Sequence, residues 1–308
     1  MRLSLPNLAK GVDATVRATS LNTEVHSESY LSSLHSSLNV SIIMEVPPVA
    51  LLPNFLVQQK ALYPFRKQVK PPLYSHLESL FNIVLSHTNQ ELQVGGTILA
   101  AKLAKERGWA INIGGGFHHC CAEKGGGFCA YADISLCIHF AFIRLHFSRV
   151  MIIDLDAHQG NGYERDFSDD RRVFILDVYN PDIYPYDFEA RRFIDHKVEV
   201  VSGTTTDLYL KKLDEALEVV GNMFDPELLV YNAGTDVLEG DPLGGLMVSP
   251  NGIINRDERV FKFAKEKKIP LIMVTSGGYM KSSARVIADS IANLSKKGLI
   301  DLDSPPVR

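Results

Sequence analysis

The segment "IIDLDAHQGNG", residues 152 to 162, begins as a buried strand and ends in side chains that can do chemistry. Asp154, Asp156 and His158 lie within five residues of one another at the end of an apolar run. A buried carboxylate or imidazole is costly unless it has a partner. Asp156 and His158, two residues apart in an extended segment, project to the same side and are suited to binding one metal ion. We place Asp154 on the opposite side of the pleat, free to support neighbouring groups.

A third ligand comes from "VYNAGTD", in which Asp236 follows another apolar run. Asp156, His158 and Asp236 form a set of two carboxylates and one imidazole. Such a set balances a divalent cation and leaves coordination positions open for water and substrate, as in catalytic metal sites. Oxygen and nitrogen ligands without a thiolate suit zinc, with iron(II) or manganese as alternatives.

Further side chains could move protons or bind a developing charge at this metal. His118 and His119, in "INIGGGFHHC", are candidates for the general acid and base of metal-assisted hydrolysis. Asp154 and Asn161 could fix the tautomers of these histidines, and Tyr279, in "TSGGY", could donate a hydrogen bond to an oxyanion. Taken singly, such residues are usually helix caps, turns or structural histidines. Their joint occurrence at the ends of successive apolar runs favours hydrolysis of an amide.

The apolar runs alternate with helical patterns. We predict strands in 109–116, 149–158, 171–179, 196–201, 227–236 and 269–279, and helices in 91–108, 131–147, 204–221, 255–268 and 282–294, with a short one after Gly162. We also predict a short surface helix within 66–90. Strands separated by helices imply a single-domain α/β fold, with a mostly parallel central sheet and helices on both faces. Ligands of such sheets bind beyond the carboxyl ends of the strands, where the polar residues should therefore meet.

The composition is that of a globular protein. The 308 residues are 45% hydrophobic and carry a net charge of −4 with acids and bases interleaved, so we expect no direct nucleic-acid binding. No apolar run approaches the roughly 20 residues of a membrane span, and the N-terminus lacks the apolar core of a secretory signal. The four cysteines lack CxxC spacing and predict reduced thiols in a reducing compartment: Cys120, Cys121, Cys129 and Cys137.

The sequence resembles the zinc-dependent histone deacetylases. The motifs that carry the resemblance are "GGGFHHC", "GGGFCAYAD", "DLDAHQGNG", "NAGTDVLEGDPLGG" and "TSGGY". The wording of "WAINIGGGFHHC", "DLDAHQGNGYERDF" and "VYNAGTDVLEGD" is similar to the class IV, histone deacetylase 11-like, branch, and in particular to a plant member. The similarity covers roughly residues 20–66 and 91–300.

The resemblance implies an arginase/deacetylase-like fold with Zn²⁺ on the three ligands named above. It pairs His118 with Asp154 and His119 with Asn161, makes His119 the preferred general base and acid, and has Tyr279 polarise the acyl carbonyl.

The resemblance also assigns the walls of an acyl-lysine tunnel. Four positions match wall residues of relatives, although core or turn roles would explain them equally well: Gly127, Phe128, Tyr184 and Leu243. Family members commonly bind K⁺ near the strand that here contains Asp154.

Two departures from the family concern the first third of the chain. Relatives carry an additional N-terminal segment for which "MRLSLPNLAKGV" leaves little room, and residues 68–93 interrupt a stretch that is nearly continuous in relatives. We therefore expect an atypical segment 1–20, a catalytic domain 21–300 with an insertion at about 68–93, and a tail 301–308. A missing segment would leave a sheet edge and part of the pocket floor uncovered.

The function implied is zinc-dependent hydrolysis of N6-acyl-lysine amides, with a role in chromatin and transcriptional repression. The expected partners are histone tails or other acyl-lysine proteins, together with corepressor or deacetylase proteins, in the nucleus and also the cytoplasm. Three alternatives remain: a catalytically impaired scaffold of the same fold, a deacylase for long-chain acyl-lysine, and a hydrolase of acetylpolyamines.

Overall fold

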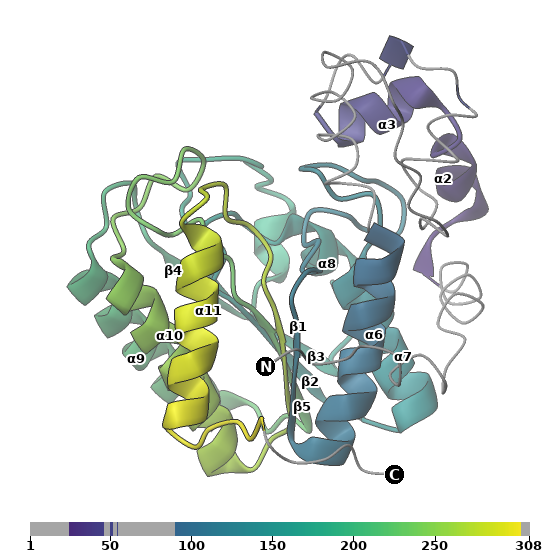
Figure 1. Ribbon diagram of the computed structural model, residues 1–308. Coiled ribbons are helices and arrows are strands. Elements are labelled where there is room, and N and C mark those ends of the chain that lie inside the picture. Colours follow the sequence, from purple (N-terminus) through teal and green to yellow (C-terminus); the bar gives the residue numbers. More distant parts are fainter. Residues whose placement is uncertain (1–24, 46–49, 52–53, 55–89, 303–308) are drawn as a thin grey trace, which may run out of the picture.

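The computed structural model describes residues 25–45, 50–51, 54 and 90–302 of the chain. Residues 90–302 form a parallel sheet covered by helices, and two short helices lie beside it, α2 (Glu28–Ser33) and α3 (Ser37–Ile43) (Figure 1). The helix predicted within 66–90 and the expected N-terminal segment 1–20 lie outside the described residues, as does most of the expected insertion.

Six strands of the described chain form one sheet in the order β1-β6-β5-β2-β3-β4, and all neighbouring strands are parallel. The strands are β1 (Trp109–Asn112), β2 (Val150–Asp154), β3 (Val173–Tyr179), β4 (His196–Glu199), β5 (Leu228–Asn232) and β6 (Leu271–Val274). The predicted α/β fold with a mostly parallel central sheet is confirmed. No strand extends beyond the end of its predicted segment, and most end several residues earlier. The polar residues that follow these strands do not take part in the strand pairing.

The central strands are continuous apolar runs because both faces of the sheet are covered. Every residue of β2, β3, β5 and β6 is buried. Val150 and Ile152 of β2 belong to the core on one face, whereas Met151 and Ile153 belong to the core on the other. Burying one such side chain contributes roughly 1.5–3 kcal/mol, so a shift of register by one residue would be costly on both faces.

Helices lie on both sides of the sheet (Figure 1). One face is covered by α9 (Thr206–Met223), α10 (Pro250–Lys267) and α11 (Ser283–Lys296), whose buried residues share a core with Met151 and Ile153. The other is covered by α6 (Gln90–Arg107) and α7 (Asp133–Leu145). Two short helices, α8 (Asn161–Asp166) and the 3₁₀ helix η2 (Ala190–Phe193), follow β2 and β3.

Helix α10 begins at Pro250, earlier than the predicted start at residue 255. The Ser249 side chain accepts a hydrogen bond from the Gly252 amide at 3.1 Å and so caps the helix. Pro250 occupies the first helical position, where its missing N–H has no partner to lose. The extra turn matters for the site, because it sets the position of Arg256 along the helix.

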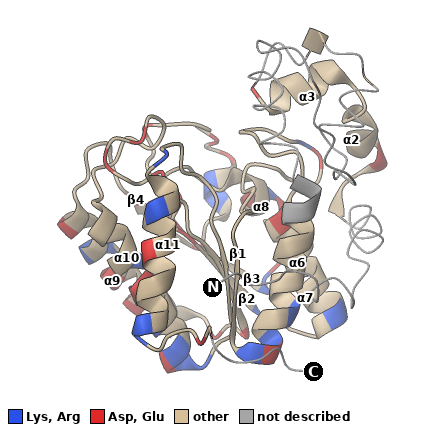
Figure 2. Ribbon diagram, in the orientation of Figure 1, with Lys and Arg blue, Asp and Glu red and all other residues tan. Residues whose placement is uncertain are grey.

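The surface charges agree with the even balance of the sequence. Lys and Arg alternate with Asp and Glu over the outer faces of the helices (Figure 2).

All four cysteines are unbridged, as predicted. Among the described residues, no helix is long and apolar enough to cross a membrane.

Candidate metal centre and active site

The polar residues singled out in the sequence meet beyond the carboxyl ends of neighbouring strands. Asp156 and His158 follow β2, Asp236 follows β5, and Tyr279 follows β6. Because β5 lies between β2 and β6 in the sheet, the loops that carry these residues are neighbours. The pair His118 and His119 comes from the loop after β1 at the sheet's edge.

Asp156, His158 and Asp236 are buried and offer one ligand atom each within 4.8 Å of one another. His158 Nδ1 lies 3.1 Å from Asp156 Oδ1 and 2.8 Å from Asp236 Oδ2. A ring nitrogen carries at most one proton, so His158 cannot donate to both carboxylates fully. The three side chains therefore have more hydrogen-bond acceptors than protons to share. Their oxygen and nitrogen atoms are suitable ligands for a divalent cation such as zinc.

Backbone amides orient both carboxylates. The Gly277 amide donates to Asp156 Oδ2 at 2.9 Å, and the Ala157 amide donates to Asp236 Oδ1 at 2.9 Å. These bonds fix the carboxylate planes, as supporting hydrogen bonds commonly do at metal sites. The ligand atoms are thus held in place by the chain itself.

Electrostatics at the cluster also favours a cation. Burial, together with the charge of Asp156, raises the pKa of Asp236 to about 7. Burial alone would lower the pKa of His158, but the two neighbouring carboxylates outweigh it and raise that pKa to about 10. Burial would raise the pKa of Asp156, but His118 and His158 hold it well below its usual value. The two carboxylates thus make the cluster retain protons, and a divalent ion would take their place.

Two glycines allow the backbone to approach the ligands closely. A Cβ at Gly234 would lie 2.2 Å from Asp156 Oδ2, and one at Gly277 would lie 2.4 Å from Asp236 Oδ2. Any larger residue would displace the carboxylates. The glycines of "NAG" and "SGG" therefore serve the spacing of the ligand atoms.

His118 is paired with Asp154, as the resemblance implied. His118 Nδ1 lies 3.0 Å from Asp154 Oδ2, and this carboxylate also accepts from the Tyr163 hydroxyl at 2.9 Å and from Asn232 Nδ2 at 3.0 Å. Burial opposes protonation of His118, but the carboxylates of Asp156 and Asp154 outweigh it and raise its pKa to about 9.

The expectation that Asp154 lies on the opposite side of the pleat from Asp156 is wrong. Val150 and Ile152 share one core while Met151 and Ile153 share the other, so Asp154 continues the even-numbered face. Asp156 follows the end of β2, and the His118 ring reaches both carboxylates, at 3.0 Å from Asp154 Oδ2 and 3.6 Å from Asp156 Oδ1, so both side chains lie on one side.

His119 is held differently from His118. His119 Nδ1 lies 2.8 Å from Asn161 Oδ1, and Asn161 Nδ2 donates to Asp187 Oδ2 at 3.1 Å. Because the amide nitrogen is committed to Asp187, the amide oxygen must accept from Nδ1, which leaves Nε2 of neutral His119 as a proton acceptor. Burial, and then the charges of His118 and His158, hold the pKa of His119 well below its usual value.

Tyr279 stands at the mouth of the site and is 42% exposed. Its ring lies edge-on to His158, with 6.4 Å between ring centroids, and its amide donates to Asp241 Oδ2 at 2.8 Å. Burial of the hydroxyl and the charges of Asp236 and Asp156 raise its pKa, so the phenol remains a hydrogen-bond donor.

Three of the four tunnel candidates border the catalytic candidates. The Tyr184 ring lies edge-on to His119 at 4.9 Å, and a Cβ on Gly127 would lie 2.3 Å from the His119 ring. The Phe128 ring lies 6.1 Å from that of Tyr279. The fourth, Leu243, is linked less directly.

Leu243 is connected to the site through its backbone. Its amide donates to Asp241 Oδ1 at 3.0 Å, and the other oxygen of Asp241 receives the Tyr279 amide. The side chain is 40% exposed. These contacts place Leu243 beside the loop of Tyr279, and its role as a tunnel wall stays a prediction.

The structure adds residues that the sequence reasoning missed. Tyr163 and Asn232 hold Asp154, Asp241 joins two loops, and Arg256 contacts the backbone behind the ligands. Asn232 and Asp241 stand inside quoted motifs and could have been noticed there. Tyr163 also stands inside a quoted motif, whereas Arg256 lies on a helix where nothing in the sequence marks it.

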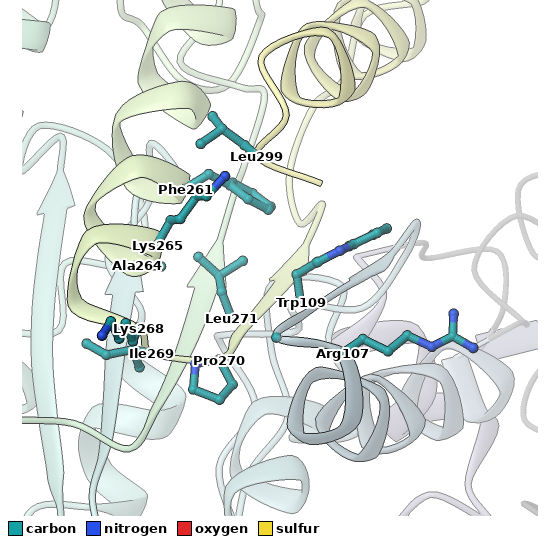
Figure 3. A pocket seen from close by; sticks show the side chains of 11 residues that line it. Arg107, Trp109, Phe261, Ala264, Lys265, Lys268, Ile269, Pro270, Leu271 and Leu299 are labelled. Carbon is teal, nitrogen blue, oxygen red and sulfur yellow. The ribbon is translucent and has the colours of Figure 1, made fainter. Parts of the chain in front are cut away.

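A separate cavity of about 290 Å³ lies at the opposite, amino end of the strands (Figure 3). Its lining combines apolar side chains, among them Trp109 and Leu299, with Arg107, Lys265 and Lys268. It contains no acid or histidine and no metal-ligand set. The chemistry therefore belongs to the carboxyl edge of the sheet.

Comparison with known proteins agrees with this architecture. The model of the histone deacetylase domain family matches residues 6–294. The chain is 70% identical over 276 residues to "Histone deacetylase 2" of Arabidopsis thaliana, a match that covers 90% of this chain and 65% of that protein. It is 29% identical over 196 residues to "Histone deacetylase 8" of Xenopus tropicalis, covering 60% and 52% of the two chains. The chain thus spans less than two thirds of the length of these relatives.

Solved structures share the fold at low sequence identity. An acetylpolyamine aminohydrolase from Burkholderia pseudomallei superposes with a TM-score of 0.62 at 18% identity, covering 92% of this chain and 89% of the other. A histone deacetylase homologue from Aquifex aeolicus gives 0.61 at 20% identity, covering 93% and 77%. With the family model matching most of its length, this chain belongs to the histone deacetylase family.

Proposed function

We propose that the protein is a zinc-dependent deacetylase that hydrolyses the amide bond of N6-acyl-lysine, and that it is a plant member of the class IV branch. The observation that carries the proposal is the convergence of Asp156, His158 and Asp236 within 4.8 Å, next to two differently held histidines. A scaffold without turnover would have no need of such an arrangement.

Each side chain has a role that follows from its contacts. A zinc ion on the three ligands would supply Lewis-acid activation of water and of the acyl carbonyl. His119, neutral and with Nε2 unprotonated, accepts the proton of the attacking water and returns it to the leaving lysine amine. His118, charged against Asp154, stabilises negative charge during the attack. The Tyr279 hydroxyl donates to the acyl oxygen.

The substrate would be bound by residues at the rim of the site. Gly127, Phe128, Tyr184 and Leu243 would wall the channel that admits the acyl-lysine chain, as proposed from the resemblance. We further propose histone tails as substrates, corepressor or other deacetylase proteins as partners, and a place in the nucleus and also the cytoplasm. The name of the Arabidopsis relative supports the histone substrate.

We also propose a K⁺ ion behind the site. Asp154 of β2 and Asp177 of β3 are register partners, and both are buried. Among the described residues no amide, hydroxyl or cationic donor reaches Asp177 Oδ1, and the side chain that interacts with Asp177 is a second buried carboxylate, Glu164. A monovalent cation between the two strands would satisfy that oxygen.

Metal analysis combined with peptide hydrolysis tests the main proposal. Purified wild-type protein should contain about one zinc per chain and hydrolyse an acetyl-lysine peptide, with inhibition by a hydroxamate chelator. Asp236→Ala should lose both the zinc and the activity. Asp169→Ala, which removes an exposed carboxylate, is the matched control and should retain both. Wild-type protein that binds no metal would refute the proposal.

One alternative substrate has structural support. The fold is shared with a protein described as an acetylpolyamine aminohydrolase. Parallel assays of an acetylpolyamine, of the acetyl-lysine peptide and of the same peptide with longer acyl chains separate this substrate and long-chain deacylation from lysine deacetylation. Metal-loaded protein that hydrolyses none of them would favour the scaffold alternative.

A further inference from the structure

Arg256 is a fully buried arginine on α10 that no proposed catalytic step uses. It is 0% exposed and lies among apolar residues of the core beneath β2 and β5. Burying a guanidinium is costly unless all its donors are used, so its contacts should reveal its purpose.

The guanidinium bridges the two strand ends that carry the metal-ligand candidates. Arg256 Nη1 donates to the carbonyl oxygen of Leu155 at 3.1 Å and to that of Gly234 at 2.5 Å. Its Nη2 donates to the carbonyl of Ala233 at 3.3 Å. Leu155 directly precedes Asp156, and Gly234 stands two residues before Asp236. One side chain therefore contacts both ligand-bearing segments.

These bonds replace the sheet ladder at the point where it stops. The β2–β5 register ends at the pair Asp154 and Asn232, and a last backbone bond crosses from the Leu155 amide to the Asn232 carbonyl oxygen at 2.9 Å. The carbonyl oxygens that Arg256 contacts lie beyond this bond. Beyond that pair the two segments diverge into loops, and backbone groups there need other partners. Arg256 supplies donors to both segments and so sets the distance between them.

The guanidinium of Arg256 is itself fixed by a buried acidic partner. Its Nε donates to Asp257 Oδ1 at 2.9 Å, and Asp257 also accepts from the Tyr231 hydroxyl at 2.5 Å and from Ser290 Oγ at 2.6 Å. A hydrogen-bonded counter-charge fixes the plane of the guanidinium and offsets its charge. The influence of Arg256 on the ligands is therefore geometric.

The spacing that Arg256 sets is transmitted to the ligand atoms through a tight contact. A Cβ built on Gly234 would lie 2.2 Å from Asp156 Oδ2, so this backbone and that carboxylate touch. A small separation of the two segments would move Asp156 relative to Asp236. Metal affinity is sensitive to such shifts, because ligand distances are tolerated within about 0.2 Å.

We propose that Arg256 is a positioning residue that holds the ends of β2 and β5 at the spacing that the three metal ligands require. The inference rests on the proposed metal site and adds a residue outside the motifs that define it. If it is correct, metal affinity depends on the hydrogen bonds that Arg256 donates to the three carbonyl oxygens. This dependence is separate from the contribution of the side chain to folding.

The test compares metal affinity in Arg256→Lys with that of the wild type. Lysine keeps the positive charge opposite Asp257 but cannot donate to three carbonyl oxygens in one plane. Metal-free proteins are titrated with Zn²⁺ or Co²⁺ against a chromophoric chelator, and the visible spectrum of bound Co²⁺ reports the ligand geometry. We expect Arg256→Lys to bind both ions about 10–100-fold more weakly, with an altered cobalt spectrum.

Two controls separate positioning from general destabilisation. Val260→Ala creates a cavity on the same helix, where Val260 is fully buried, and should lower the Tm while leaving metal affinity within about threefold of wild type. Arg259→Lys alters a partly exposed arginine of α10 that pairs with Asp214 and should change neither quantity.

The outcomes are distinct. A folded Arg256→Lys protein with wild-type metal affinity overturns the inference, as does an equal loss of affinity in Val260→Ala. If Arg256→Lys does not fold, the double variant Arg256→Met with Asp257→Asn, which removes both buried charges, is judged by the same criteria. Wild-type protein that binds neither ion refutes the proposed metal site itself.

Discussion

Gly277→Ala should damage the metal centre by displacing two carboxylates at once. The added Cβ would lie 2.4 Å from Asp236 Oδ2 and 2.7 Å from Asp156 Oδ2. Ordinary contacts at such a Cβ begin near 3.4 Å. The two oxygens would therefore have to retreat by about 0.5–1 Å, several times the roughly 0.2 Å that metal–ligand distances tolerate.

The expected loss follows from that displacement. Misplacing a reacting group by about 1 Å costs roughly 100-fold in rate, which corresponds to about 2.7 kcal/mol. Metal affinity should fall by about 10–100-fold, as it does when groups that orient ligands are altered. The backbone at Gly277 does not lie in the left-handed region, so alanine adds no conformational strain of its own.

Chelator competition and initial rates on an acetyl-lysine peptide measure the two effects. Gly95→Ala is the matched control, because a Cβ at Gly95 would meet nothing within 4 Å. This change in the middle of α6 should leave affinity and rate unaltered and add about 0.5–1 kcal/mol of stability. A folded Gly277→Ala protein with wild-type metal affinity would show that the ligand spacing has been misjudged.

Three further predictions concern the supporting residues. Asn161→Ala should free the His119 tautomer and lower kcat about 10–100-fold at unchanged zinc content; an unchanged kcat would remove His119 from the proton-transfer role. Tyr279→Phe should lower kcat about 100–1000-fold, also with zinc retained, and a loss seen only in KM would contradict the oxyanion role. Burial raises the pKa of Asp166 to about 6, so the folded state loses stability as pH rises from about 4 to 6. The expected loss is about 2 kcal/mol after allowance for partial exposure, and Asp166→Asn should abolish it. The free energy of unfolding in urea, compared between pH 4 and pH 7, measures this difference. Equal pH dependence in the two proteins would contradict it.

Local pattern was sufficient to predict the elements of the sheet. Apolar runs buried on both faces leave no alternation, and each of the six predicted strand segments contains an observed strand. The start of α10 was predicted wrongly because the helix is set by its Ser249 cap and Pro250, which lie ahead of the periodic segment. Periodicity reports which side chains face a core, whereas caps are single residues.

The candidate ligands were also readable in the sequence. Asp156, His158 and Asp236 are polar residues placed directly after buried strands, where the cost of burial demands a reason. The sequence could not show that β5 would be the direct neighbour of β2, because strand order depends on how whole helices pack across the sheet. Only that order brings Asp236 to within hydrogen-bond distance of His158, at 2.8 Å.

The sequence by itself thus determined the residue types of the site, the order of strands and helices along the chain, and the edge at which they act. The tertiary structure decided what each residue meets. Asn232 and Tyr163 converge on Asp154, and Arg256 joins two strand ends from a helix on the other side of the core. Such contacts link residues 9 to 101 positions apart, and they arise from packing that no periodic pattern records. The distinct protonation of His118 and His119, adjacent in sequence, likewise arises from the carboxylate or amide that the fold places against each ring.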